Sequence, residues 1–156
     1  MFTRPPIELT PEGDYRLRFS DSERELLGRL PAELLELLAT DPDDPALRRL
    51  RPSAYDNDPE AEDEYRRLVQ DELEEGRRKA LRVLAETAAR DRLTADELDS
   101  WLRALTDLRL ALGTRLDVTE EVYEREIDPR DPQAYELSVF AYLSWLQEQA
   151  VEAAMR

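Results

Sequence analysis

The side chains of this 156-residue chain that could do chemistry are carboxylates and arginines, because the sequence contains no cysteine and no histidine. This composition excludes thiol nucleophiles, thiolate metal sites and disulfides, and it removes the commonest general base and metal ligand. Carboxylate pairs can still perform acid–base chemistry or bind Mg²⁺, and acids cluster at 41–44 and 72–75. A solvated acidic surface is the favoured interpretation of both clusters, and the isolated glycines form no phosphate-binding loop. We therefore expect no catalytic, cofactor-binding or metal-binding residue.

Residues 94–116 carry the most informative pattern. Thr94 and Glu97 have the spacing of a capping box, which predicts a helix start, and leucines follow at helical spacing. Arg109 falls inside the apolar stripe of this helix, where an unpaired guanidinium would be very costly. We therefore expect Arg109 to be largely buried and to meet backbone carbonyls or an acid from another helix. The candidate acids are Glu25, Glu33 and Glu136.

Two alternatives for Arg109 stay open, namely a snorkelling side chain and an anchor for a ligand or partner. On the opposite side of the same helix, Arg103 can pair with Asp99 and Asp107 at four-residue spacing. Leu110 is the apolar exception on that side. A single exposed leucine is normal, and a role in partner binding is the alternative.

The last predicted helix, from about 132 to 154, has apolar residues all round it. Val139, Leu143 and Leu146 form one face, whereas Leu137 and Trp145 point elsewhere. A helix that is apolar on all sides is buried on all sides. The pattern favours the central helix of a bundle, with an oligomer seam as the alternative, and it assigns the aromatic residues of this helix to the core.

The first 19 residues differ from the rest. Ile7 and Leu9 alternate with polar residues, as do Tyr15 and Leu17, and the turn sequence 11–14 lies between the two runs. Such period-two patterning around a turn predicts a β-hairpin. Because an isolated hairpin is marginal in water, its apolar side chains should face the helices.

The remaining residues, 20–156, read as helices and the loops between them. Ser20 and Glu23 form a capping box, and Pro31 should kink the helix that follows or split it in two. A short helix is expected at 45–50, and a long one from an Asp58 N-cap to about Ala89. We also expect a close helix crossing at Gly76 and a loop over 117–131. No boundary supports a second domain, so residues 1–156 are expected to form one mainly α domain, a four- to five-helix bundle with a small N-terminal β-hairpin.

The net charge of −15 disfavours direct binding to nucleic acid, because affinity for a phosphate backbone comes from neutralising phosphates. The best local basic cluster is Arg48, Arg49 and Arg51. No apolar run approaches the ~20 residues that span a bilayer, and the N-terminus lacks the apolar core of a signal peptide. These features predict a soluble protein with no membrane association.

Residues 101–116, WLRALTDLRLALGTRL, resemble the signature of the actinobacterial domain-of-unknown-function family numbered 2017. Two further stretches support the resemblance, PSAY at 52–55 before an Asp-Pro helix start and YLSWLQE at 142–148. This family is associated with AosR-type oxidative-stress transcriptional regulators. The resemblance implies a cytoplasmic regulatory protein that works through a sigma factor or RNA polymerase. The redox mode proposed for such regulators uses a pair of cysteines, which this sequence lacks, so a thiol sensor is not implied here.

Three hypotheses follow. The first is a regulatory protein-interaction module linked to oxidative-stress transcription. The second, implied by the family's gene context beside the ClpS-type adaptor, is an accessory factor of Clp proteolysis. The third is a carboxylate-metal or small-molecule-binding enzyme. A protein partner and a homodimer are both compatible with the first. The residues of the candidate interaction or structural motif are Trp101, Arg103, Asp107, Arg109, Leu110, Gly113, Arg115 and Trp145.

Overall fold

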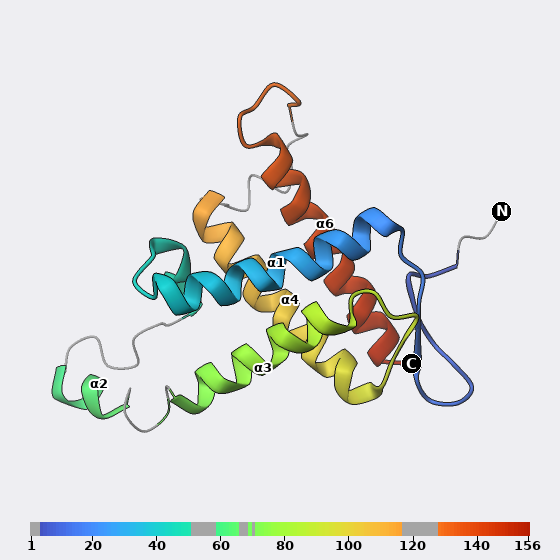
Figure 1. Ribbon diagram of the computed structural model, residues 1–156, viewed down its shortest axis with the longest axis horizontal. Coiled ribbons are helices and arrows are strands. Elements are labelled where there is room, and N and C mark those ends of the chain that lie inside the picture. Colours follow the sequence, from blue (N-terminus) through green and yellow to red (C-terminus); the bar gives the residue numbers. More distant parts are fainter. Residues whose placement is uncertain (1–3, 51–58, 66–68, 70, 117–127) are drawn as a thin grey trace.

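The computed structural model describes residues 4–50, 59–65, 69, 71–116 and 128–156. The prediction of a mainly α protein with a small N-terminal β element is confirmed (Figure 1). The helices are α1 (Asp21–Thr40), the 3-10 helix η1 (Pro45–Leu50), α2 (Pro59–Tyr65), α3 (Asp71–Thr87), α4 (Ala95–Leu116) and α6 (Ala134–Ala154). The strands are β1 (Ile7–Leu9), β2 (Tyr15–Leu17) and β3 (Arg92–Leu93).

Helix α4 is the centre of the molecule. It packs against α3, α6 and η1, and it passes beneath α1 in the view of Figure 1. Its stripe of buried residues includes Leu98, Trp101, Leu105 and Leu108. The capping box of Thr94 and Glu97 that begins this helix is confirmed by two reciprocal hydrogen bonds, of 3.1 and 2.9 Å.

The prediction that the last helix is the central one is wrong. One face of α6 is buried through Val139, Leu143 and Leu146, but Trp145 on another side is 42% exposed and Tyr135 is 65% exposed. The apolar character of α6 is spread round the helix, whereas the neighbouring elements cover only part of its surface. Those neighbours include α4 and β1.

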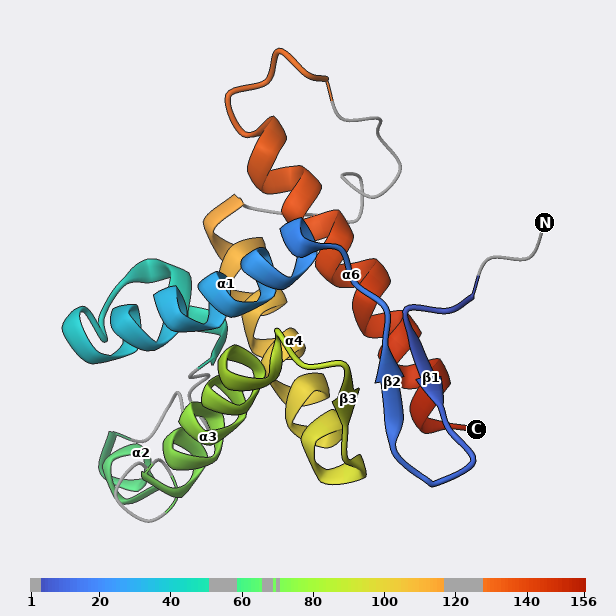
Figure 2. The same ribbon diagram turned by 45° about the vertical axis from the view of Figure 1, so that its right-hand side comes forward.

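The predicted hairpin is confirmed and gains a third strand. Strands β1 and β2 pair antiparallel, with Ile7 opposite Leu17, and β3 adds to the free edge of β2 through Leu93 opposite Tyr15. Figure 2 shows this sheet beside the C-terminal part of α6, which β1 contacts. Gly13 in the turn has a φ of +91°, a conformation that glycine adopts without a steric penalty.

Helix α1 begins at the predicted capping box, in which Glu23 N–H donates to Ser20 Oγ and Ser20 N–H donates to the Glu23 carboxylate. Pro31 does not split the helix, because α1 runs without interruption from Asp21 to Thr40 and buries Pro31. The short helix expected at 45–50 is confirmed as η1.

The long helix expected over 58–89 is described as two helices, α2 and α3. Asp58, its predicted N-cap, lies outside the described residues. Acidic residues crowd the first turn of α3, where Asp71, Glu72 and Glu74 favour a helix start through the helix dipole. The close approach at Gly76 is made by a side chain, since a Cβ there would lie 3.1 Å from Arg103 Nη2.

Candidate functional site

Trp101, the first residue of the family-like motif, is a core residue. Its side chain is fully buried, and its indole Nε1–H donates to Thr87 Oγ1 at 2.7 Å. Its ring stacks on that of Phe19 with centroids 5.9 Å apart. Trp101 therefore ties α4 to α3 and to the segment that precedes α1, and it offers no surface to a partner.

Asp107 lies at the junction of α3, α4 and η1. Its Oδ2 accepts a hydrogen bond of 3.2 Å from Arg77 Nε, and Arg77 Nη2 also donates to the Leu50 carbonyl at 2.9 Å. Burial raises the pKa of the Asp107 carboxyl, while the charges of Arg77 and Arg103 oppose that rise. The ion pair of Asp107 thus joins two helices rather than following the four-residue spacing within α4.

Arg103 lies on the exposed side of this junction, with its guanidinium over Gly76. A depression of about 220 Å³ is lined by Leu73, Arg77, Arg103, Thr106 and Asp107. The lack of a side chain at Gly76 makes room for Arg103 there, which accounts for a glycine in the apolar stripe of α3.

Arg109, which was expected to be largely buried, has an intermediate exposure at the edge of the contact between α4 and α6. Its Nε donates to Ser144 Oγ at 3.0 Å, its Nη1 donates to Gln147 Oε1, and its guanidinium lies over the Phe140 ring, 5.8 Å from the centroid. The long side chain reaches the edge of the interface, where polar atoms and solvent meet it. Two candidate acids, Glu25 and Glu33, pair with Arg29 instead.

Of the remaining motif residues on α4, some pack against the core and others are exposed to solvent. Leu110 is partly buried against the core rather than isolated in solvent. Gly113 is buried, and a Cβ at its position would lie 3.2 Å from Phe140 Cε2, so the glycine permits the close approach of α4 and α6. Arg115 is exposed in the last turn of α4.

Trp145, the motif residue on α6, lies at the surface. Its ring is half exposed and lies 5.8 Å from the ring of Tyr142. Tyr142 Oη–H donates to Glu23 Oε2 of α1 at 2.8 Å. Burial and this carboxylate raise the pKa of Tyr142 well above its ordinary value.

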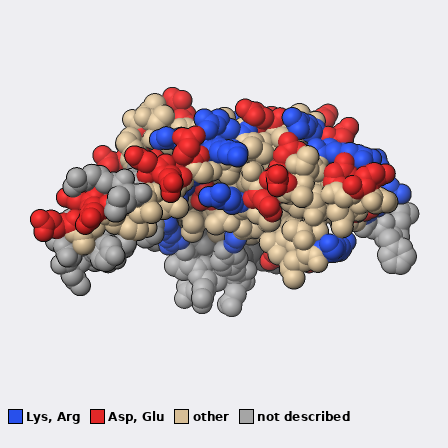
Figure 3. Space-filling view, turned by 90° about the horizontal axis from the view of Figure 1, so that it is seen from below, with Lys and Arg blue, Asp and Glu red and all other residues tan. Residues whose placement is uncertain are grey.

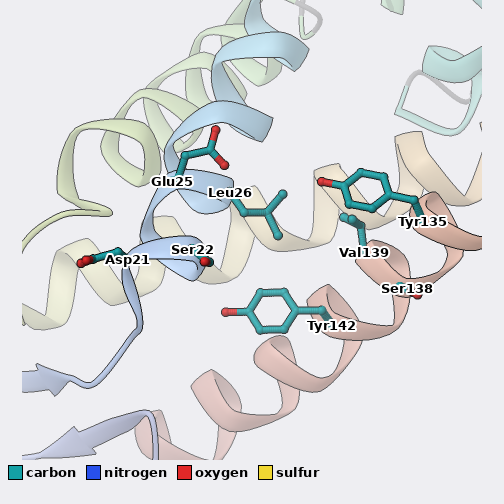
Figure 4. A pocket seen from close by; sticks show the side chains of 8 residues that line it. All are labelled: Asp21, Ser22, Glu25, Leu26, Tyr135, Ser138, Val139 and Tyr142. Carbon is teal, nitrogen blue, oxygen red and sulfur yellow. The ribbon is translucent and has the colours of Figure 1, made fainter.

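A groove between α1 and α6 lies on the side of α6 that carries Tyr142 (Figure 4). Its volume is about 580 Å³. The lining residues are Asp21, Ser22, Glu25 and Leu26 from α1 and Tyr135, Ser138, Val139 and Tyr142 from α6. Sequence reasoning missed this groove. The one signal that could have indicated it is the pair of tyrosines seven residues apart, which places both rings on one side of α6.

The described residues contain no group of three or more His, Cys, Asp or Glu side chains that could hold a metal ion. Within the same residues, no helix is both long and apolar enough to cross a membrane. Figure 3 shows acidic and basic side chains intermixed over one face, with acids gathered at its left-hand end, where Figure 1 places α2.

The structure thus describes a mainly helical protein with a central helix, α4, and an open groove between α1 and α6. The chain belongs to the family described as domain of unknown function DUF2017, whose model matches residues 4–154. No solved structure matches this chain.

The chain is similar to curated proteins that carry a functional name. The oxidative stress regulator AosR of Mycobacterium tuberculosis and that of Mycobacterium bovis are each 34% identical to this chain over 131 residues. The putative oxidative stress regulator AosR of Mycobacterium leprae has the same identity over the same length. Each match covers 73% of this chain and 60% of the relative, so the chain spans about three fifths of the length of these regulators.

Proposed function

We propose that this protein is a non-enzymatic regulator of the oxidative-stress response that acts on transcription through a protein partner, a sigma factor or RNA polymerase. The observation that carries the proposal is the match to relatives named oxidative stress regulators, at 34% identity over 73% of this chain. The family model extends the relationship over residues 4–154.

Action through a protein partner fits the surface better than direct binding to DNA. A net charge of −15 opposes contact with a phosphate backbone. Partly exposed aromatic side chains, by contrast, are enriched at protein interfaces, and α6 presents Tyr135, Tyr142 and Trp145. This sequence has no thiol, so a cysteine switch within it is not part of the proposal.

The direct test measures complex formation with purified components from the source organism. The labelled protein is titrated with RNA polymerase core enzyme, with each sigma factor, and with the Clp adaptor and unfoldase. We expect saturable binding to a sigma factor or to RNA polymerase. Binding to the Clp components alone would overturn the transcriptional version in favour of a proteolysis factor.

A deletion strain provides the second test. After mild peroxide treatment, its transcript profile should differ from that of the parent strain in stress-response genes, and a plasmid copy of the gene should restore the parental profile. Identical profiles in the deletion and parent strains, with and without peroxide, would contradict the proposed role.

A further inference from the structure

The groove between α1 and α6 has room for a side chain from another molecule. Its volume of about 580 Å³ falls in the range of ligand pockets, roughly 300–1,000 Å³. Leu26 is partly buried and Val139 is buried, and Figure 4 shows both between the two helices, with the Tyr135 and Tyr142 rings beside them. The groove therefore offers an apolar floor flanked by two aromatic rings.

Both rings are held in place through their hydroxyl groups. Tyr142 Oη–H donates to Glu23 at 2.8 Å, and the oxygen of Tyr135 accepts a hydrogen bond of 3.1 Å from Arg29. Each bond links α6 to α1 across the groove. Rings held in this way lose little conformational entropy when a ligand binds, which favours association.

The charged side chains that line the groove are acidic, and Arg29 lies beside them, where it donates to Glu25 and to the oxygen of Tyr135. Asp21 and Glu25, one helical turn apart on α1, line it together with the tyrosines, and no basic residue is among the lining residues. Asp21 is exposed, and Glu25 remains 63% exposed although it pairs with Arg29. Two carboxylates and two ring faces all attract a cation, the rings through cation–π contact.

We propose that this groove is the docking site for a short peptide segment of a partner protein that carries basic side chains next to an apolar or aromatic residue. The apolar residue lies on Leu26 and Val139 between the tyrosine rings, and the arginine or lysine side chains pair with Asp21 and Glu25. The inference deepens the proposed function and rests on it for the existence of a protein partner, but not for the partner's identity. A nucleic acid or an anionic membrane would bring phosphates to the same two carboxylates, which repel them.

The probe that tests the site is a fluorescein-labelled eight-residue peptide, GRLRWLRG, with GELEWLEG as its charge-reversed counterpart. Fluorescence anisotropy at moderate salt follows binding to the full chain. We expect saturable binding of the basic peptide and at least tenfold weaker binding of the acidic peptide, because electrostatic complementarity separates the two.

Three variants assign the binding to the groove. Asp21→Asn combined with Glu25→Gln should weaken binding by roughly fivefold, the effect of two exposed ion pairs. Tyr135→Ala should weaken it by a similar factor through loss of an exposed ring. Asp96→Asn combined with Asp99→Asn removes the same number of charges from exposed positions of α4 outside the groove, and it should change binding by less than about twofold.

Equal weakening by the two double variants would show attraction by net charge alone and would overturn the proposal, as would the absence of binding by the basic peptide. Circular dichroism confirms that each variant is folded before it is titrated. A groove variant that no longer binds the peptide but still binds its RNA polymerase or sigma partner would overturn the docking site and leave the proposed function intact. Peptide binding at the groove by a protein that binds neither RNA polymerase nor a sigma factor would overturn the proposed function and leave the docking site intact.

Discussion

At the scale of single residues, polar side chains link the helices at the edges of their contacts. Arg109 joins α4 to α6 through Ser144 and Gln147. Tyr142 joins α6 to α1 through Glu23, and Arg77 joins α3 to α4 through Asp107. Each arginine or tyrosine donates from a half-buried position, where a hydrogen bond is stronger than in water and the desolvation cost is moderate.

Arg109→Ala should lower the free energy of unfolding by about 2 kcal/mol, because it removes hydrogen bonds from a charged donor and the contact with Phe140. Urea denaturation measures the loss. Arg115→Ala is the matched control, since Arg115 lies exposed on the same helix and its removal should change stability by less than about 0.5 kcal/mol. A loss for Arg109→Ala no larger than that of the control would show that the contacts of Arg109 do not stabilise the fold.

Tyr142 should make stability depend on alkaline pH. Because burial and Glu23 raise its pKa in the folded state, the folded protein keeps the phenolic proton at pH values where the unfolded chain, with a pKa of ~10, releases it. The contribution of Tyr142 is therefore fully present below about pH 10 and decreases as the pH rises further.

Tyr142→Phe isolates this effect. At pH 8 the variant should be less stable than the parent protein by about 1 kcal/mol, because it loses the hydrogen bond to Glu23. The difference should shrink between about pH 9.5 and 11, as measured by urea denaturation at each pH. A constant difference over that interval would contradict the raised pKa.

At the scale of elements, two glycines in helix interiors differ in the space that their neighbours leave for a side chain. A Cβ at Gly28 of α1 would have only ordinary contacts, at 3.9 Å from Ala85 O and Ala88 Cβ. A Cβ at Gly113 of α4 would lie 3.2 Å from the ring of Phe140. The two glycines occupy helix interiors with opposite requirements for space.

Gly28→Ala should therefore raise the free energy of unfolding by about 0.5–1 kcal/mol through helix propensity. Gly113→Leu should lower it by about 2 kcal/mol, since the added side chain must displace Phe140 from a packed position. Thermal and urea denaturation test whether Gly28→Ala raises the free energy of unfolding and Gly113→Leu lowers it. Stabilisation by Gly113→Leu would mean that α4 and α6 can separate without cost.

At the scale of the whole molecule, the sequence combines a high acidic charge with the absence of thiols. Mild peroxide should leave the helicity and the oligomeric state unchanged, because the readily oxidised side chains are the two methionines, Met1 and Met155. Met155 is 81% exposed at the end of α6, so its oxidation should disturb little packing. Circular dichroism and size-exclusion chromatography before and after treatment measure the response, and a reversible change in either would contradict this expectation.

The sequence alone determined the local structure of this protein. The capping boxes at Ser20 and Thr94 set the starts of α1 and α4, and period-two patterning set the hairpin, because these signals depend on residues only a few positions apart. The helical stripe also placed Leu98, Trp101 and Leu105 correctly in the core.

Only the tertiary structure decided which helix is central, which strand completes the sheet and where the groove lies. Apolar residues all round α6 suggested a central helix, yet α4 holds that position because it is covered from more directions. The groove depends on contacts such as that between Tyr142 and Glu23, which are 119 residues apart. Such contacts follow from how whole helices pack, and no periodicity within one helix encodes the partner that its exposed side will meet.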